Sequence, residues 1–332
     1  MPALFPASYS TLSPSALAAL IETAYGFTSV RCTLLVRGVG DTYSIETPGS
    51  RYILRVYRSS HRSLTQVAAE LELLLDLQAA GVPVSYPLRD DEGALVQVLD
   101  AIEGPRYGVL FTYAAGQSVS IPNASQLRNL GREVARFHNI SSGYENDGRR
   151  WTYDLDTTLF QPLERLEPYF SEYPEGIAWL RRAAEAVRER LERMDTSGFS
   201  TGYCHFDLLP KNFHFEGDAV TLFDFDFLGY GWLVNDMMTF WQHLNVEVYL
   251  GRLTQTAADE AYKIFLDGYR EYRPLGTEEL KAMPYLMLGF WVFYMGFHTT
   301  HDQFLPFLQT SSLRLRTGAL RKMMEMYTDL TL

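Results

Sequence analysis

Hydrophobic and polar residues follow two different rhythms along this chain. Between residues 30 and 115 many apolar positions recur every second residue, which predicts strands, whereas most of the later chain has the longer period of amphipathic helices. A chain of 332 residues also exceeds a comfortable single core. We therefore expect an N-terminal lobe over residues 1–115, a mainly helical C-terminal lobe over residues 116–332, and a hinge at about 111–118.

The N-terminal pattern predicts a small antiparallel sheet with one helix packed on it. A helix is expected at about 13–25, and strands near 30–37, 42–47 and 51–58 and in the segments ALVQVL and RYGVLFTY. A further helix begins after Ser63, where Ser63 and Gln66 have the spacing of a capping box. Its apolar face is predicted at positions 64, 67, 68, 71, 74 and 75.

Composition and charge narrow the possible partners. The chain is 47% apolar and 14% aromatic, as folded proteins are, and its 29 basic and 40 acidic residues give a net charge of −11. This charge argues against nucleic acid and anionic membranes as partners. Two cysteines and no basic residue before Arg31 predict a cytoplasmic protein without a disulfide framework or secretory leader. The apolar run at 282–297 is shorter than the ~20 residues that cross a bilayer, so we expect a buried helix there.

The segment HFDLLPKN, residues 205–212, carries the main chemical signal. Asp207 and Asn212 stand around Pro210 in a predicted loop. A carboxylate there can accept or orient the proton of an attacking hydroxyl, and the Asn212 amide oxygen can hold Mg²⁺ on a triphosphate together with a second carboxylate. Asp224 is the expected second carboxylate, because it ends the alternating strand AVTLFDF, which a turn at EGD would return to the side of Asn212. These residues together indicate phosphoryl transfer from Mg-ATP.

HFDLLPKN and the following LFDFD resemble the H-x-D-x4-N and D-x-D loops of the aminoglycoside phosphotransferase and choline kinase-like superfamily. The segments YILRVYR, AELELLLDLQAAGVPV, GPRYGVLFTYAAGQSV and DFDFLGYGWLVNDM are together similar to the stress-response kinase A (RdoA-like) branch and its homoserine kinase type II-like neighbours. The resemblance implies an α+β, bilobal protein kinase-like fold and ATP-dependent phosphorylation of a hydroxyl group. It also implies that His205 supports the loop instead of transferring protons.

Two acidic residues beyond Asp224 keep alternative roles. Asp226 either assists the metal or satisfies loop amides. Asp236 is expected to be a scaffold carboxylate, which either caps the following helix or ties to the catalytic loop.

The upstream lobe is expected to hold the nucleotide. RGVGDTY lies where this architecture has its phosphate-covering loop, and the alternative is that these residues form an ordinary hairpin turn. Strand alternation puts Arg55 on the nucleotide side, and Leu54 and Val56 on the opposite face, under the helix. Related kinases usually have lysine at this position, and we expect an ion pair of Arg55 with Glu70, which borders the apolar face more closely than Glu72.

Backbone groups of VLFTYAAG are predicted to bind adenine, the alternative being a plain edge strand. The full set of residues expected to contact the nucleotide is Gly38, Gly40, Asp41, Thr42, Ile53, Arg55, Glu70, Thr112, Tyr113 and Ala114.

The acceptor has no diagnostic motif. Trp151, Asp154 and Asp156 are candidates without informative spacing, and the overall acidity favours a cationic acceptor. HTTHD at 298–302 is interpreted as a surface helix end instead of a metal site. We expect a small-molecule kinase acting on a homoserine-like compound, an amino alcohol or an aminoglycoside. A stress-response Ser/Thr protein kinase and a nucleotide-binding pseudokinase remain alternatives, although only LGYGWLVND stands where protein kinases carry a longer activation segment.

Overall fold

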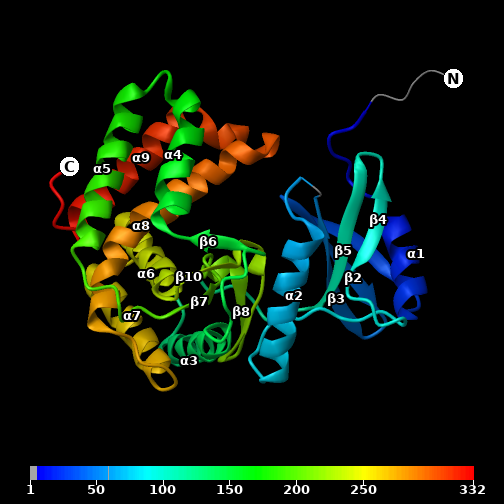
Figure 1. The fold of residues 1–332 in the computed structure, drawn as a ribbon. Coiled ribbons are helices and arrows are strands. Elements are labelled where there is room, and N and C mark those ends of the chain that lie inside the picture. Colours follow the sequence, from blue (N-terminus) through cyan, green and yellow to red (C-terminus); the bar gives the residue numbers. More distant parts are fainter. Residues whose placement is uncertain (1–5, 59) are drawn as a thin grey trace. The chain divides into compact units, whose positions relative to one another are not determined.

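The computed structural model describes residues 6–58 and 60–332. The chain divides into two compact units (Figure 1). We call them the N-lobe, which runs to Ala115 and includes Thr221–Phe223, and the C-lobe, which comprises Gly116–Val220 and Asp224–Leu332. Gly116 has a φ of +87°, and a Cβ there would lie 2.1 Å from the carbonyl oxygen of Phe215. Glycine is therefore required where the C-lobe begins.

The N-lobe is built on an antiparallel sheet with the strand order β1-β2-β3-β5-β4. Its strands are β1 (Arg31–Arg37), β2 (Gly40–Thr47), β3 (Ser50–Tyr57), β4 (Gln97–Ala101) and β5 (Gly104–Thr112), and its helices are α1 (Pro14–Tyr25) and α2 (Leu64–Ala79). The segment that enters this lobe from the C-lobe bonds to the chain after α2, because Ser85 N donates to Leu222 O and Leu222 N donates to Pro83 O, each at 2.9 Å.

The two faces of β3 meet different helices, and one of them was assigned wrongly from the sequence. Leu54 and Val56 do not pack under the helix that follows them; they share a core with Leu17 and Ile21 of α1. The other face meets α2, where the Tyr57 hydroxyl donates to Glu70 Oε1 at 3.1 Å. Alternation separates the faces of a strand, but it does not tell which helix covers each face.

The start of α2 follows the prediction closely. Ser63 Oγ accepts a hydrogen bond from Gln66 N at 3.2 Å, and Gln66 Oε1 accepts one from Ser63 N at 3.0 Å, which confirms the capping box. The predicted apolar face is only partly right, because Leu64 and Ala68 are exposed. Further residues complete the buried face: Ala69, Glu70, Leu73 and Leu77. Alanine and glutamate give no clear signal of burial, so the pattern of apolar residues alone did not predict the border of the buried face correctly.

The C-lobe combines helices with two small sheets. In the first sheet β10 (Gly229–Trp232) lies between β6 (Trp151–Tyr153), to which it is parallel, and β7 (Thr201–Cys204), to which it is antiparallel. The second is the hairpin of β8 (Phe213–Glu216) and β9 (Ala219–Leu222), the last two residues of which belong to the N-lobe. The helices are α3 (Ala124–Ser141), α4 (Gln161–Leu166), α5 (Pro174–Glu192), α6 (Val234–Tyr249), α7 (Gln255–Arg270), α8 (Thr277–Phe297) and α9 (Thr310–Tyr327).

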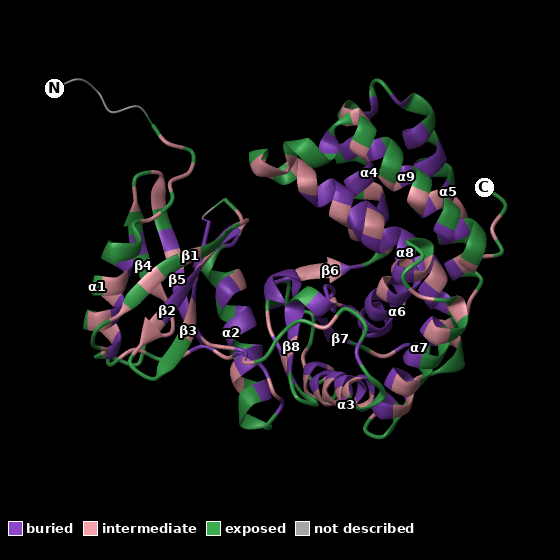
Figure 2. Cartoon of the chain, turned by 180° about the vertical axis from the view of Figure 1, so that it is seen from behind, coloured by how far each residue is buried: buried purple, intermediate pink, exposed green. Residues whose placement is uncertain are grey.

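Helices α6 and α8 form much of the C-lobe core (Figure 2). The segment Thr277–Thr300 is long and apolar enough to cross a membrane by length and composition alone, but 72% of its apolar window is buried inside the protein. The buried helix predicted around 282–297 is therefore confirmed, and it begins earlier, at Thr277.

Helices α3 and α7 cross at two glycines. A Cβ on Gly131 would lie 2.1 Å from the carbonyl oxygen of Phe265, and a Cβ on Gly268 would lie 2.1 Å from that of Arg128. Each helix therefore presses its backbone against a glycine of the other helix.

We predict that Gly131→Ala lowers the free energy of unfolding by at least ~1–3 kcal/mol, because the methyl group forces the two backbones apart. Gly318→Ala is the matched control, since Gly318 lies in α9 with no atom within 4 Å of its Cβ position. The control should gain ~0.5–1 kcal/mol from helix propensity. Urea unfolding of both variants measures the difference, and equal effects would show that the crossing tolerates side chains.

Candidate catalytic site

The catalytic loop predicted from the sequence runs from β7 to β8 and contains a 3-10 turn at Pro210–Asn212. Asn212 Nδ2 donates to Asp207 Oδ2 at 2.7 Å and to the Asp207 carbonyl oxygen at 2.8 Å. The oxygen of the same amide makes no hydrogen bond with a described residue. Asn212 thus fixes Asp207 with its nitrogen and keeps its oxygen available for a ligand.

The two oxygens of Asp207 have different surroundings. Oδ2 also forms an ion pair with Lys211 Nζ at a distance of 2.8 Å. Oδ1 is buried, and no described residue donates a well-formed hydrogen bond to it. Burial raises the pKa of the Tyr294 hydroxyl well above its usual range, and so do the negative charge of Asp207, the interaction of the hydroxyl with Asp207 and the negative charge of Asp224. The charges of both Asp207 and Asp224 thus act on Tyr294.

Asp224 stands in a turn and not at the end of a strand. The strand predicted over AVTLFDF ends at Leu222, and Asp224 is exposed in the left-handed region with φ 61° and ψ 62°. Aspartate tolerates this conformation better than most residues, which allows the chain to turn into the 3-10 helix Phe225–Phe227. Asp226 in that turn is buried, and its carbonyl oxygen accepts a hydrogen bond from Arg150.

Asp236 holds the catalytic loop through its backbone. Its carboxylate accepts hydrogen bonds from His205 N at 2.8 Å and from Phe206 N at 2.6 Å. Phe206 has a φ of +62°, which is strained for a residue with a side chain. Of the two roles considered for Asp236, the structure shows the tie to the loop. His205 is fully buried with its ring 4.5 Å from that of Phe225, as a supporting residue would be.

Behind Asp236 lies a network that the sequence did not reveal. His138 Nε2 and Asp236 Oδ2 are 3.0 Å apart, and His138 Nδ1 lies 2.8 Å from the Tyr269 hydroxyl. Burial lowers the pKa of His138, so the ring is neutral near pH 7. Because a carboxylate only accepts, His138 donates to Asp236 and Tyr269 donates to His138. A lone histidine on a helix gave no signal for this role.

In the N-lobe the predicted phosphate-covering loop is shorter than expected. Gly40 and Thr42 already belong to β2, and Gly38 N donates to Gly40 O at 3.2 Å across the turn. Thr42 pairs with Arg55 in the sheet, and a Cβ on Gly40 would lie 3.6 Å from Arg55 Nε. The structure therefore brings the glycine turn and Arg55 together. Ile53 lies two residues before Arg55 on β3 and is half-buried.

Asp41 has a structural partner inside the N-lobe. Its carboxylate is fully buried, lies 3.0 Å from Arg106 Nη2, and accepts a hydrogen bond from the Tyr9 hydroxyl. A buried pair of this kind costs much to break, because the remaining charge would be left without a partner. Only the backbone of Asp41 therefore remains suitable for contacting a nucleotide.

The remaining predicted nucleotide contacts lie on α2 and at the end of β5. Glu70 is buried and Glu72 exposed, as their positions on the helix indicated. Both backbone groups of Thr112 are engaged, because its N–H donates to Tyr86 O at 3.0 Å and its carbonyl oxygen accepts from Ser85 Oγ at 2.5 Å. Tyr113 and Ala114 follow this strand end, and the Tyr113 hydroxyl lies 3.4 Å from Arg51 Nη1.

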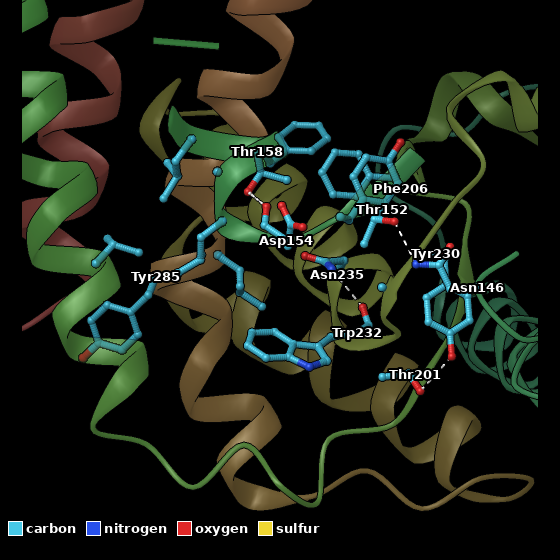
Figure 3. Close-up of a pocket in the computed structure, with 18 residues that line it drawn as sticks. Asn146, Thr152, Asp154, Thr158, Thr201, Phe206, Tyr230, Trp232, Asn235 and Tyr285 are labelled. Atoms are coloured by element: carbon cyan, nitrogen blue, oxygen red, sulfur yellow. Dashed lines mark hydrogen bonds between the residues drawn. The ribbon is translucent and has the colours of Figure 1, made fainter. Parts of the chain in front are cut away.

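A cavity of about 310 Å³ in the C-lobe is lined by residues of β6, β10, α8 and the predicted catalytic loop (Figure 3). Phe206, the residue before Asp207, lines it and stacks on Tyr153 with ring centroids 3.6 Å apart. Asp154 also lines it, but Asp154 Oδ1 accepts a hydrogen bond from Thr157 N at 2.8 Å and so caps the following turn. Most of the wall is aromatic or aliphatic, which makes the cavity a poor match for a polar acceptor.

The sequence matches the phosphotransferase enzyme family over residues 32–275. It is 37% identical over 297 residues to an uncharacterised protein of Deinococcus radiodurans, covering 88% of this chain and 84% of that protein. It is 26% identical over 269 residues to a homoserine kinase of Methylobacillus glycogenes, covering 78% of this chain and 77% of the relative. The chain belongs to the phosphotransferase enzyme family.

Solved structures agree with this assignment at the level of the fold. An amicoumacin kinase in complex with AMP-PNP, Ca²⁺ and Ami superposes with a TM-score of 0.74 and 21% identity, over 96% of both chains. The expected kinase-like α+β fold is confirmed, and so are the resemblance to aminoglycoside phosphotransferases and homoserine kinases and the expectation that the chain is a phosphotransferase.

Asp236→Asn should loosen the catalytic loop, because an amide nitrogen would replace an oxygen that now accepts a hydrogen bond. An unsatisfied buried group costs about 1–3 kcal/mol, and a displaced Asp207 should lower kcat by roughly tenfold or more. Urea unfolding and steady-state kinetics measure the two effects. Tyr269→Phe is the control, since it removes the outer bond of the network without touching the loop. Full activity of Asp236→Asn would contradict the role given to Asp236.

Proposed function

We propose that this protein transfers the γ-phosphoryl group of Mg-ATP to a hydroxyl group of a small molecule. The observation that supports this most strongly is the 2.7 Å hydrogen bond from Asn212 Nδ2 to Asp207 Oδ2. It keeps one oxygen of Asp207 and the oxygen of Asn212 available at the same place, as a hydroxyl acceptor and a metal each require.

The chemistry of the donor set fits Mg²⁺. Asn212 and Asp224 would hold the ion, because both side chains offer oxygen and the Asn212 amide already fixes Asp207 through its nitrogen. Asp226 is a further candidate ligand, and its burial also suits a role in satisfying the loop. When bound, Mg-ATP supplies the phosphoryl group and part of the charge neutralisation that the transfer needs.

Asp207 performs the step on the acceptor. Its Oδ1 accepts the hydrogen bond of the acceptor hydroxyl and takes its proton as the acceptor oxygen bonds to the γ-phosphorus. The bond from that phosphorus to the β–γ bridging oxygen breaks, and ADP leaves. Asn212 and Lys211 on Oδ2 hold the carboxylate in place and keep it from turning. Because Lys211 already forms an ion pair with Oδ2, catalysis depends mainly on how the carboxylate orients the acceptor hydroxyl.

The N-lobe residues are proposed to hold the nucleotide. Backbone amides of Gly38, Gly40, Asp41 and Thr42 cover the phosphates, and Arg55 binds their oxygens and is oriented by Glu70. Ile53 contacts the nucleotide from the same strand. The adenine contacts are assigned to Thr112, Tyr113 and Ala114, of which the Thr112 backbone also makes two hydrogen bonds within the lobe.

Asp207→Asn should lower kcat by ~10²–10⁴-fold, the range typical of a lost acid–base group, and leave Mg-ATP affinity within about twofold because the metal ligands stay. Transfer of γ-³²P to pooled small alcohols and a nucleotide titration measure the two quantities. Asp195→Asn, in an exposed loop, controls for the lost charge. Undiminished transfer by Asp207→Asn would remove the assigned base.

Asp224→Asn should weaken nucleotide binding only when Mg²⁺ is present. The substitution removes the charge that attracts the ion while leaving its size nearly unchanged. We expect the Kd of Mg-AMP-PNP to rise about tenfold or more, with the Kd of metal-free AMP-PNP unchanged or lower, since a negative charge near the phosphates is gone. Calorimetric titration with and without Mg²⁺ distinguishes the cases, and equal weakening in both would contradict a metal role.

A further inference from the structure

A cluster of cationic and aromatic side chains extends from Asp207 along the C-lobe. Lys211 Nζ contacts Asp207 Oδ2 at 2.8 Å and lies 5.7 Å from the ring centroid of Tyr294. Tyr294 and His298 have ring centroids 6.4 Å apart on α8 and its end. His298 Nδ1 lies 2.8 Å from Arg316 Nη1 on α9. We call Lys211, Tyr294, His298 and Arg316 the Arg316 cluster.

Arg316 is the member whose charge is not balanced. It is half-buried, and burial lowers its pKa. No carboxylate of the residues that the structure describes forms an ion pair with it, whereas Arg314 on the same helix pairs with Glu175 Oε1 at 3.1 Å. A partly desolvated charge without a counterion is costly, so proteins rarely retain one unless it meets an anion.

The neighbours of Arg316 fix the position of its guanidinium group without neutralising its charge. Burial and the positive charges of Arg316 and Lys211 lower the pKa of His298 to about 4. The neutral ring therefore accepts a hydrogen bond from Arg316 and carries no charge of its own near pH 7. The Arg316 guanidinium lies 4.9 Å from the ring centroid of Phe307, which also stacks on His298. The guanidinium is thus held from two sides, which suits bidentate binding of a planar anion.

We propose that Arg316 binds a carboxylate of the acceptor, so that the substrate is a hydroxy acid or hydroxy amino acid and not a purely cationic amino alcohol or aminoglycoside. This inference rests on the proposed function, because it places the acceptor at Asp207. Arg316 then acts in specificity, while Asp207 acts on the hydroxyl. The sequence suggested a cationic acceptor from the overall charge, whereas the side chains that extend from Asp207 favour an anionic group.

Three acceptors that differ in one group test the proposal. L-Homoserine carries a carboxylate and an ammonium, 4-hydroxybutanoate only the carboxylate, and 3-aminopropan-1-ol only the ammonium. We expect wild-type kcat/KM to be about tenfold or more higher for the two carboxylates than for 3-aminopropan-1-ol. Arg316→Gln should raise KM for both carboxylates by about tenfold or more, with kcat nearly unchanged, and leave 3-aminopropan-1-ol unaffected. Arg316→Lys should retain part of the preference, and Arg314→Gln should behave as wild type.

Equal use of all three acceptors by the wild type would overturn the inference while supporting the proposed function. A loss of kcat by Arg316→Gln for every acceptor would also overturn it, because Arg316 would then act on the phosphoryl group.

Thermal shifts in the presence of Mg-AMP-PNP separate binding from transfer. Stabilisation of the wild type, but not of Arg316→Gln, by the carboxylates would support the inference even if no label moved, and absent transfer would then count against the proposed function alone. No preference for carboxylates in binding would overturn the inference.

Discussion

The geometry around Asp207 depends on one buried carboxylate, that of Asp236. The loop turns through a left-handed residue at Phe206, and such a turn leaves two consecutive amides pointing inward, where water cannot satisfy them. Asp236 accepts both amides, and His138 donates to the same group. In a low-dielectric interior these bonds strengthen one another, and they stabilise a backbone conformation that is unfavourable by itself. The strained turn and the buried charge are therefore mutually dependent.

This constraint determines how Asp207 meets its neighbours. With the backbone fixed on one side, Asn212 and Lys211 reach the same carboxylate oxygen and leave the other without a well-formed bond. An unrestrained aspartate would rotate and share its partners between both oxygens. The division of roles between the two oxygens thus follows from a bond network that does not include the side chain of Asp207.

The parts of the site that the sequence predicted are the local ones. Asp207, Asn212 and Asp224 lie within one loop and hairpin, so their spacing in the chain constrains their spacing in space. His138 lies 98 residues from Asp236, and only the packing of α3 on the rest of the lobe brings them together. The division into a strand-rich and a helical part and most strands followed from periodicity, and the kinase-like fold class followed from the family resemblance. The packing of α1 on β3 was missed because alternation identifies the faces of a strand and not their partners. Arg316 gave no signal, because a single arginine in a helix is ordinary until its neighbours are known.

Net charge and local charge describe different stages of binding. The value of −11 acts on a ligand approaching through solvent, but at physiological salt this field is screened beyond ~8 Å. Affinity depends on the groups in contact with the ligand. Lys211 contacts Asp207 directly, and Arg316 is linked to Lys211 through Tyr294 and His298. The negative net charge of the protein would slow the approach of a free anion, and the local cationic side chains would then bind it. A zwitterion has no net charge and is not repelled during approach, so both stages are compatible with a hydroxy amino acid.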